Sequence, residues 1–245
     1  MAGLSGAGLL APGGVREQIA GAASLGYRAV QLDGATTEMR ARELDRSARR
    51  DLAALLRRLG LSLSGIDLWI PPAHFVDAAK SDRAADAVSG AAALAGELAV
   101  LVGQHGQSGR VVCVKLPPDA GGGLYAHLSS ECERHGVVLA DHAWPARAHA
   151  AGVVKVGIDP AELIFAGVDP AVETARLPET PGAARLSDLS ASGRVEPGAG
   201  RLDRHAYEAA LHTRGFQGPL IVDLRGLPDV PGAARRLAGT RGPAA

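Results

Sequence analysis

Short aliphatic runs that end in a carboxylate recur along the chain. The clearest runs occupy residues 136–141, 153–159 and 219–223 and close on Asp141, Asp159 and Asp223. Residues 29–33 and 61–67 repeat the pattern earlier in the chain, and a weaker run occupies residues 183–188. A compact apolar run of this kind is typical of a strand that is buried on both faces of a parallel sheet. One aspartate at such a point is often only the N-cap of the next helix, but a repeated pattern favours strands whose carboxyl ends meet at one acidic region.

Apolar residues at helical spacing fill the intervals between these runs. In residues 43–59, for example, Leu52, Leu55 and Leu59 recur at three- and four-residue steps, and the arginines lie largely on the other face. The other predicted helices are residues 15–25, 81–102, 124–135, 144–151 and 203–213, and one more helix begins at residue 160. The predicted strands are residues 4–10, 28–32, 61–68, 111–115, 136–141, 153–159, 183–189 and 219–223, with loops at residues 69–75 and 190–200.

Strands that alternate with helices indicate an α/β fold. The 245 residues contain no long linker, so we expect a single domain over residues 1–245 with a frayed tail at residues 239–245. A closed (β/α)8 TIM barrel is favoured over a doubly wound open sheet, because no GxGxxG turn joins a strand to a helix. In either architecture, ligands bind beyond the carboxyl ends of the strands, where the aspartates lie.

Charge and composition argue against several classes of function. Lys+Arg and Asp+Glu both number 26, so no net field attracts nucleic acid or an anionic membrane. The N-terminal segment does not resemble a signal peptide, and no uninterrupted apolar run reaches the roughly 18 residues of a membrane span. Cys113 and Cys132 are too few for a disulfide framework or a zinc cluster, and we expect a cytoplasmic protein.

Other side chains stand where a site would form. Trp69 and His74 lie in the predicted loop after the third strand, which either walls a substrate pocket or is an ordinary packed loop. Lys115 ends the fourth strand, where its ammonium group either binds an anionic group or extends to solvent on its apolar stem. Asp33 and Asp67 also follow strands, but we expect them to act as helix caps rather than in chemistry.

Six phrases of the sequence keep the order found in one family, at residues 25–32, 59–64, 136–140, 158–163, 197–203 and 215–223. With these phrases the chain resembles the xylose-isomerase-like barrels of the sugar isomerase/epimerase superfamily over nearly its whole length. The resemblance implies one divalent metal (Mn, Mg, Co or Zn), held by a glutamate after strand five, an aspartate after strand six, a histidine in strand seven and a glutamate after strand eight. It also implies that the two glutamates move a proton between adjacent carbons of an α-hydroxy carbonyl compound.

The metal-binding positions depart from the family pattern. Only Asp159 matches outright. The strand-five position falls on Asp141 or His142, depending on a one-residue gap, and the strand-eight position falls on Asp223. The strand-seven histidine falls on Arg185, whose guanidinium has no lone pair to offer a metal. A carboxylate shortened from Glu to Asp is also withdrawn from the substrate, and a misplacement of about 1 Å can cost on the order of a hundredfold in rate.

These departures leave two functions open. In the first, the protein is an isomerase or epimerase of a small sugar or keto acid, with Asp141 and Asp223 as acid and base. Its substrate would be bound by His142, Arg185, Glu162, Lys115, His74 and Trp69, and any metal by Asp159, Asp223 and Asp141. In the second, Arg185 replaces the metal, because its permanent positive charge pairs with the acids. The barrel is then a catalytically degenerate protein that binds a sugar or polyol, or a structural subunit.

The endonuclease branch of the same superfamily is disfavoured. Its members need many more His and Glu metal ligands, and most of the eight histidines here are predicted in helices or loops away from the strand ends. Neutral net charge also argues against a groove for nucleic acid. Family members often form dimers or tetramers, so a homo-oligomer is an open expectation that no stretch of this sequence marks.

Overall fold

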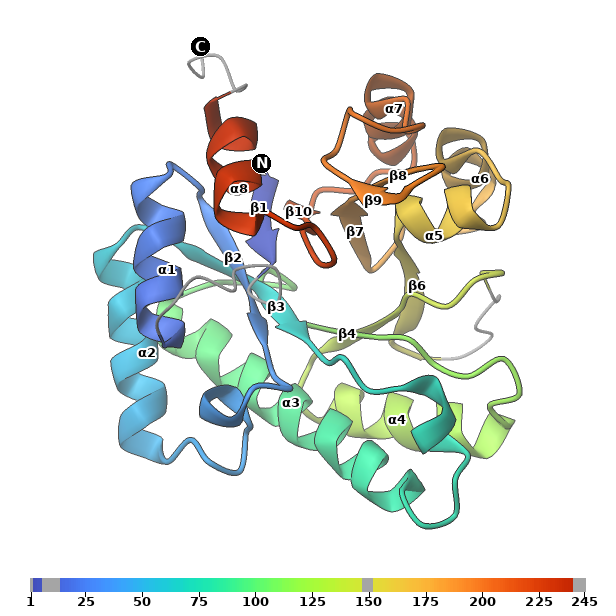
Figure 1. The fold of residues 1–245 in the computed structure, drawn as a ribbon. Helices are drawn as coiled ribbons and strands as arrows, with labels where there is room; N and C mark the ends of the chain where they lie inside the picture. The colour runs from blue at the N-terminus through green and yellow to red at the C-terminus, as the bar shows by residue number, and fades with distance from the viewer. Residues whose placement is uncertain (1, 6–13, 147–151, 240–245) are drawn as a thin grey trace.

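Parallel strands close into a barrel in the computed structural model, which describes residues 2–5, 14–146 and 152–239 (Figure 1). The barrel strands are β1 (Ala2–Ser5), β2 (Ala29–Asp33), β3 (Ser62–Asp67), β4 (Val111–Val114), β5 (Val138–Asp141), β6 (Val154–Ile158), β7 (Ala183–Leu186) and β10 (Leu220–Val222). Strand β1 pairs with both β2 and β10, which closes the ring in the order β1-β10-β7-β6-β5-β4-β3-β2. The predicted eight-stranded α/β barrel is confirmed.

Helices surround the barrel (Figure 1). They are α1 (Val15–Ser24), α2 (Arg46–Arg58), α3 (Ser81–Val102), α4 (Gly122–Arg134), α5 (Pro160–Phe165), α6 (Pro170–Arg176), α7 (Arg204–Thr213) and α8 (Val230–Gly239), with short 3-10 helices η2 (Thr37–Met39) and η3 (Pro72–Phe75). Helix α2 shows how the sequence determines where a helix begins and which face it buries. The Asp45 carboxylate accepts the Ala48 N–H at 2.8 Å and caps the helix, while Leu52 and Leu56 are buried on its inner face.

Helix α3 is the longest helix in the described part of the chain, and its apolar composition has a structural reason. By length and composition alone it is the one described helix that could cross a membrane. In this fold it packs on β3, β4, α2 and α4. A Cβ added at Gly96 would lie 2.9 Å from the His135 carbonyl oxygen, so glycine is needed there for α3 to approach its neighbour this closely. Its alanines therefore serve close packing on the barrel wall.

Three predicted segments need correction. The first strand was predicted at residues 4–10, whereas β1 is Ala2–Ser5 and residues 6–13 lie outside the described part. Residues 190–200 were predicted as a loop, but β8 (Asp188–Ser190) and β9 (Gly193–Val195) form an antiparallel hairpin there. Of the helix predicted at residues 144–151, residues 144–146 are not helical, and the remainder lies outside the described part.

Two helices, α6 and α8, were not predicted from the sequence. Both begin near a proline in the first turn, at Pro170 and Pro231, where a missing N–H costs nothing. Asp169 caps α6 by accepting the N–H groups of Ala171 and Val172 at 2.8 and 3.0 Å. The end of the predicted frayed tail, residues 240–245, also lies outside the described part.

Candidate functional site

Side-chain alternation decides which residues enter the barrel. Successive residues of a strand point to opposite faces. On β5, Leu139 belongs to the core between strands and helices, whereas Ala140 packs with Cys113 in a separate small cluster. By the same alternation Asp141 points toward the helices and His142 points into the barrel. Of the two residues that the sequence could not separate, His142 is therefore the one that faces into the barrel.

Four inward-facing charged residues meet at the carboxyl ends of separate strands. Asp67 ends β3, Asp159 follows β6, Arg185 lies in β7 and Asp223 follows β10. Each residue is at most 4% exposed. Parallel strands bring their carboxyl ends to the same mouth of the barrel, so residues separated by up to 156 positions in the chain become neighbours. Of these, Asp159, Arg185 and Asp223 were proposed from the sequence.

Arg185 lies at the centre of this group. Its Nη2 donates to Asp67 Oδ1 at 2.9 Å, and its Nη1 donates to Asp159 Oδ2 at 3.1 Å. Its Nε is 3.9 Å from Asp223 Oδ2, and this nitrogen has no hydrogen-bond partner in the structure. The guanidinium thus bridges two carboxylates directly and lies beside a third.

Two further arginines close the group from the solvent side. Arg194, on β9, donates to Asp223 Oδ2 at 3.1 Å, and Arg225 donates to Asp223 Oδ1 at 2.8 Å and to Asp67 Oδ2 at 3.2 Å. We call the six residues Asp67, Asp159, Asp223, Arg185, Arg194 and Arg225 the Asp–Arg cluster. Its formal charges balance. The Arg194 and Arg225 side chains remain 22% and 14% exposed, so they form the boundary between the cluster and water.

The pKa values follow from this pairing. Burial by itself would raise the pKa of Asp223, but the hydrogen bonds and charge of Arg225, together with Arg185 and Arg194, hold that pKa well below its usual range. Burial by itself would lower the pKa of Arg185. The carboxylates of Asp67 and Asp159 outweigh that effect, so the pKa of Arg185 lies above its ordinary value. Asp223 is therefore a fixed anion at neutral pH and a poor proton acceptor.

The hairpin that carries Arg194 is held by a carboxylate that the sequence did not single out. Asp188 is 1% exposed and accepts backbone hydrogen bonds. Its donors are the N–H groups of Leu189, Gly198, Gly200, Arg201 and Leu202, each at 2.8 to 2.9 Å. A carboxylate that gathers backbone N–H groups in this way fixes the surrounding loop, and through it the place of Arg194.

His142 is buried beside the cluster without hydrogen bonds. It is 3% exposed, and neither ring nitrogen has a hydrogen-bond partner. The Ile158 backbone lies next to the ring but makes no hydrogen bond of normal geometry with it. Burial first, and then the charges of Arg185 and Arg225, lower its pKa well below the ordinary value, so the imidazole is neutral. A cavity of about 10 Å³ beside it has room for about one water molecule.

Asp141 points to the helix side of β5, away from the Asp–Arg cluster. Its Oδ1 accepts the N–H groups of Leu116 and Ala143 at 3.0 and 2.9 Å, and Tyr125 of α4 donates to its Oδ2 at 3.3 Å. The carboxylate therefore joins the ends of β4 and β5 on the helix side. This placement gives no support to the predicted pairing of Asp141 with Asp223 as acid and base.

The remaining predicted site residues lie outside the Asp–Arg cluster, although Trp69 contacts it. Lys115 forms an ion pair with Glu162 at 2.8 Å, and both side chains are about one-third exposed. Trp69 lies over Arg225, with the guanidinium carbon 4.2 Å from the ring centre, and is 55% exposed. Both Trp69 and His74 also line a large cavity on the outer side of β3.

Sequence reasoning missed three members of the Asp–Arg cluster. Asp67 was expected to cap a helix, but it binds Arg185 and Arg225 instead. Its signal was available, since it ends an aliphatic run like those of Asp159 and Asp223. Arg194 lies in the segment predicted as a loop, and Arg225 lies three residues beyond the end of β10, so neither had a signal in the pattern. Asp33 was also expected to cap a helix, but its Oδ1 accepts the Ala35 N–H at 2.9 Å within a turn, and the N-cap of the following 3-10 helix is Thr36.

Comparison with known structures identifies the fold. A xylose isomerase domain protein from Alicyclobacillus acidocaldarius is 17% identical, with a TM-score of 0.69 over 97% of this chain and 95% of that one. A D-psicose 3-epimerase solved in the presence of D-fructose is 15% identical, with a TM-score of 0.69 over 98% of both chains. The IOLI protein, solved with a zinc atom, is 14% identical, with a TM-score of 0.65 over 97% and 96%. No family model and no curated protein matches the sequence.

The chain therefore has the xylose-isomerase-like barrel fold, as its sequence phrases indicated. Structures that share this fold include xylose isomerase-like domain proteins and sugar epimerases. At these identities the likeness defines the architecture, and the chemistry has to be argued from the residues at the mouth.

The residues at the mouth do not fit the divalent metal that the fold family implies. Asp159 already accepts from Arg185, Ser187 and the Ala161 N–H. Asp223 is held by Arg194 and Arg225, and Arg185, at the position that the sequence resemblance assigns to a histidine ligand, has no lone pair for a metal. Within the described ranges, no three His, Cys, Asp or Glu side chains are grouped so as to hold an ion. A cation would have to displace arginines from each carboxylate.

Proposed function

We propose that the protein is a metal-independent relative of the sugar isomerases and epimerases that binds a small polar molecule at the barrel mouth and does not perform their metal-dependent proton transfer. The observation that carries this proposal is Arg185, which donates to Asp67 and Asp159 at 2.9 and 3.1 Å from the position of the family's histidine ligand. A buried guanidinium there supplies the positive charge that a metal supplies elsewhere, but it is not a Lewis acid with an open coordination position.

The carboxylates also lack the properties of an acid–base pair. A general base works best when its pKa is close to the working pH, and the arginines hold the pKa of Asp223 far below that range. The other predicted partner, Asp141, is occupied by two backbone N–H groups and Tyr125. These contacts support a binding or structural role for the acids, which is the alternative that the sequence left open.

The mouth offers groups that suit a sugar, a polyol or a small keto acid. Arg194 and Arg225 are partly exposed and carry several N–H donors, and the Trp69 indole beside Arg225 provides an exposed aromatic surface. Deeper in the barrel, Arg185 Nε and both nitrogens of His142 have no hydrogen-bond partners in the protein. Buried polar atoms without partners are costly, so a hydroxyl-bearing ligand or a water molecule beside them is favoured.

Metal analysis and isotope exchange test this proposal together. The wild type and the Arg185→His variant are purified without added metal and analysed for Mn, Mg, Co and Zn. Each protein is then incubated with ketoses and hydroxy keto acids in deuterated water. We expect no stoichiometric metal in the wild type and no deuterium incorporated into the substrates. Tight metal binding by the wild type, or metal-dependent deuterium incorporation, would overturn the proposal.

A second candidate is a metal-independent isomerase that uses His142. The observation in its favour is the position of the buried imidazole, which lies beside Arg185 and has no hydrogen-bond partner at either ring nitrogen. This candidate predicts deuterium incorporation that survives chelation of metals and is abolished in His142→Leu. Incorporation that persists in the leucine variant would exclude His142 as the base.

A further inference from the structure

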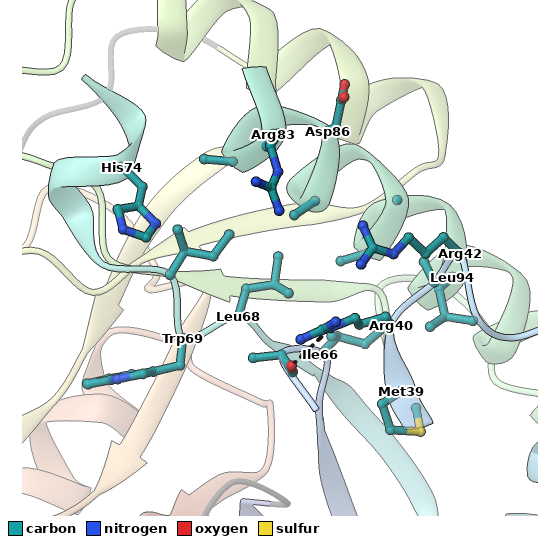
Figure 2. Close-up of a pocket in the computed structure, with 18 of the residues that line it drawn as sticks. Met39, Arg40, Arg42, Ile66, Leu68, Trp69, His74, Arg83, Asp86 and Leu94 are labelled. Carbon is teal, nitrogen blue, oxygen red and sulfur yellow. Dashed lines mark hydrogen bonds between the residues drawn. The ribbon is translucent and has the colours of Figure 1, made fainter. Parts of the chain in front are cut away.

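A second, larger cavity lies on the opposite face of β3 from the Asp–Arg cluster. It has a volume of about 700 Å³, within the range of small-molecule pockets. Its walls come from the segment after β2, the end of β3 with the loop that follows, and helix α3 (Figure 2). Ile66 and Leu68 line it, whereas Asp67 between them points into the barrel and binds Arg185. The strand itself therefore separates the cavity from the cluster.

The base of the cavity is apolar. Met39, Ile66, Leu68 and Leu94 line it and are each at most 4% exposed (Figure 2). Helix α3 contributes only small side chains to much of the opposite wall, at Ala84, Ala87, Gly90 and Ala91. Because these residues project little beyond the backbone, a space remains between the helix and the strand. An apolar group that entered it would leave water for a surface of aliphatic carbon and sulfur.

The rim of the same cavity is cationic. Arg40 and Arg42 come from the segment after β2, and Arg83 comes from α3 (Figure 2). Arg42 is paired with Glu43 at 3.0 Å, outside the lining. Arg40 and Arg83 form no ion pair with any residue in the described ranges. Within the same ranges, the Arg40 side chain makes one long hydrogen bond, in which its Nε donates to the Ala35 carbonyl at 3.4 Å.

Little negative charge offsets these guanidiniums. Asp86 is the single acidic residue among those that line the cavity, and Figure 2 shows its carboxylate directed away from Arg40 and Arg42. Lys80 also lines the cavity and is paired with Asp77 at 2.9 Å. Two arginines therefore remain available to an anion at the opening.

We infer that this cavity is a binding site for a single-tailed amphipathic anion, a carboxylate or phosphate monoester with an apolar body. Arg40 and Arg83 would receive the anionic head through charge-assisted hydrogen bonds, and the apolar body would lie on Ile66, Leu68 and Leu94. A bare inorganic anion would leave the base uncovered. A neutral apolar molecule would leave the two guanidiniums without a partner.

Calorimetric titration with octyl phosphate, kept below its critical micelle concentration, tests the inference. We expect one molecule to bind per chain, and octanoate to bind at the same site. Butyl phosphate should bind at least about tenfold more weakly, because it buries four fewer methylene groups. Octyl glucoside has the same tail without charge and inorganic phosphate has the charge without a tail, and both should bind at least about tenfold more weakly as well.

Matched arginine variants locate the site. The double variant Arg40→Ala/Arg83→Ala should weaken octyl phosphate at least about fivefold, since two charge-assisted contacts are lost. Both side chains are exposed, so the fold should survive. Arg50→Ala serves as the control, because Arg50 is exposed on α2, does not line the cavity and carries the same charge. The inference is overturned if octyl phosphate does not bind, if octyl glucoside binds as well, or if Arg50→Ala weakens binding as much as the double variant does.

Discussion

Replacing Arg185 by methionine should destabilise the fold strongly, because the guanidinium is the shared partner of buried carboxylates. Two direct charge-assisted hydrogen bonds are lost, at 2.9 and 3.1 Å, and each such bond is worth roughly 1.5–3 kcal/mol. Part of this loss is offset, because the variant no longer has to remove a charged guanidinium from water. The net cost should match that of breaking a buried ion pair, about 3–5 kcal/mol. For a chain of this size the expected fall in Tm is roughly 6–20 °C.

The loss should also depend on pH, in a direction that the structure fixes. In the wild type the pKa of Asp223 is held low, so the stability it contributes is complete above the ordinary aspartate pKa of about 3.9 and is lost only below it. In the variant, protonation of a carboxylate left without Arg185 relieves the buried charge. The variant should therefore be destabilised, relative to wild type, by more at pH 7.5 than at pH 5.

Urea unfolding followed by circular dichroism at both pH values measures this prediction. Arg194→Met is the control, since its side chain is 22% exposed and it makes one direct hydrogen bond with the cluster, at 3.1 Å. It should cost only about 1 kcal/mol. Asp159→Asn should recover part of the stability in the Arg185→Met background, although it lowers stability in the wild type. A loss below about 1 kcal/mol for Arg185→Met, or one equal to that of Arg194→Met at both pH values, would refute the reasoning.

Three further measurements probe the barrel interior. Gly157→Ala should cost about 1–3 kcal/mol in urea unfolding, because the new Cβ would lie 2.7 Å from the His142 ring, whereas Gly21→Ala on an open face of α1 should stabilise by roughly 0.5–1 kcal/mol. The lowered pKa of His142 means that the unfolded chain binds a proton there before the folded one does. Wild type should therefore lose stability between pH 7 and pH 5 relative to His142→Leu, by as much as about 2 kcal/mol, and equal pH dependence in the two proteins would contradict this. Burial raises the pKa of Cys113 and Cys132 to about 12, so neither thiol should react with Ellman's reagent at pH 8 until the protein is unfolded.

The sequence was sufficient to predict the barrel, because parallel strands that are buried on both faces produce apolar runs that need no knowledge of their partners. The same runs pointed to Asp159 and Asp223, which end them, whereas Arg185 was proposed from the resemblance to the family, and the structure places the three side chains together. The sequence could not separate Asp141 from His142, since a shift of one residue turns a side chain to the other face of the strand. Nor could it place Arg194, whose position depends on a hairpin held by Asp188 through backbone N–H groups that lie ten or more residues further along the chain.

The charge balance of the cluster explains why one substitution is not expected to recreate a metal site. Three carboxylates at the mouth carry a formal charge of −3, which Arg185, Arg194 and Arg225 cancel. In Arg185→His a neutral imidazole would leave two arginines in place, and both still bind Asp223. The family pattern would make Asp223 a metal ligand. To bind it, a divalent cation would then have to displace both guanidiniums from Asp223. Under the proposed function, the positive charge that a metal would supply comes from three side chains in three separate segments, so a metal site would require all three to change.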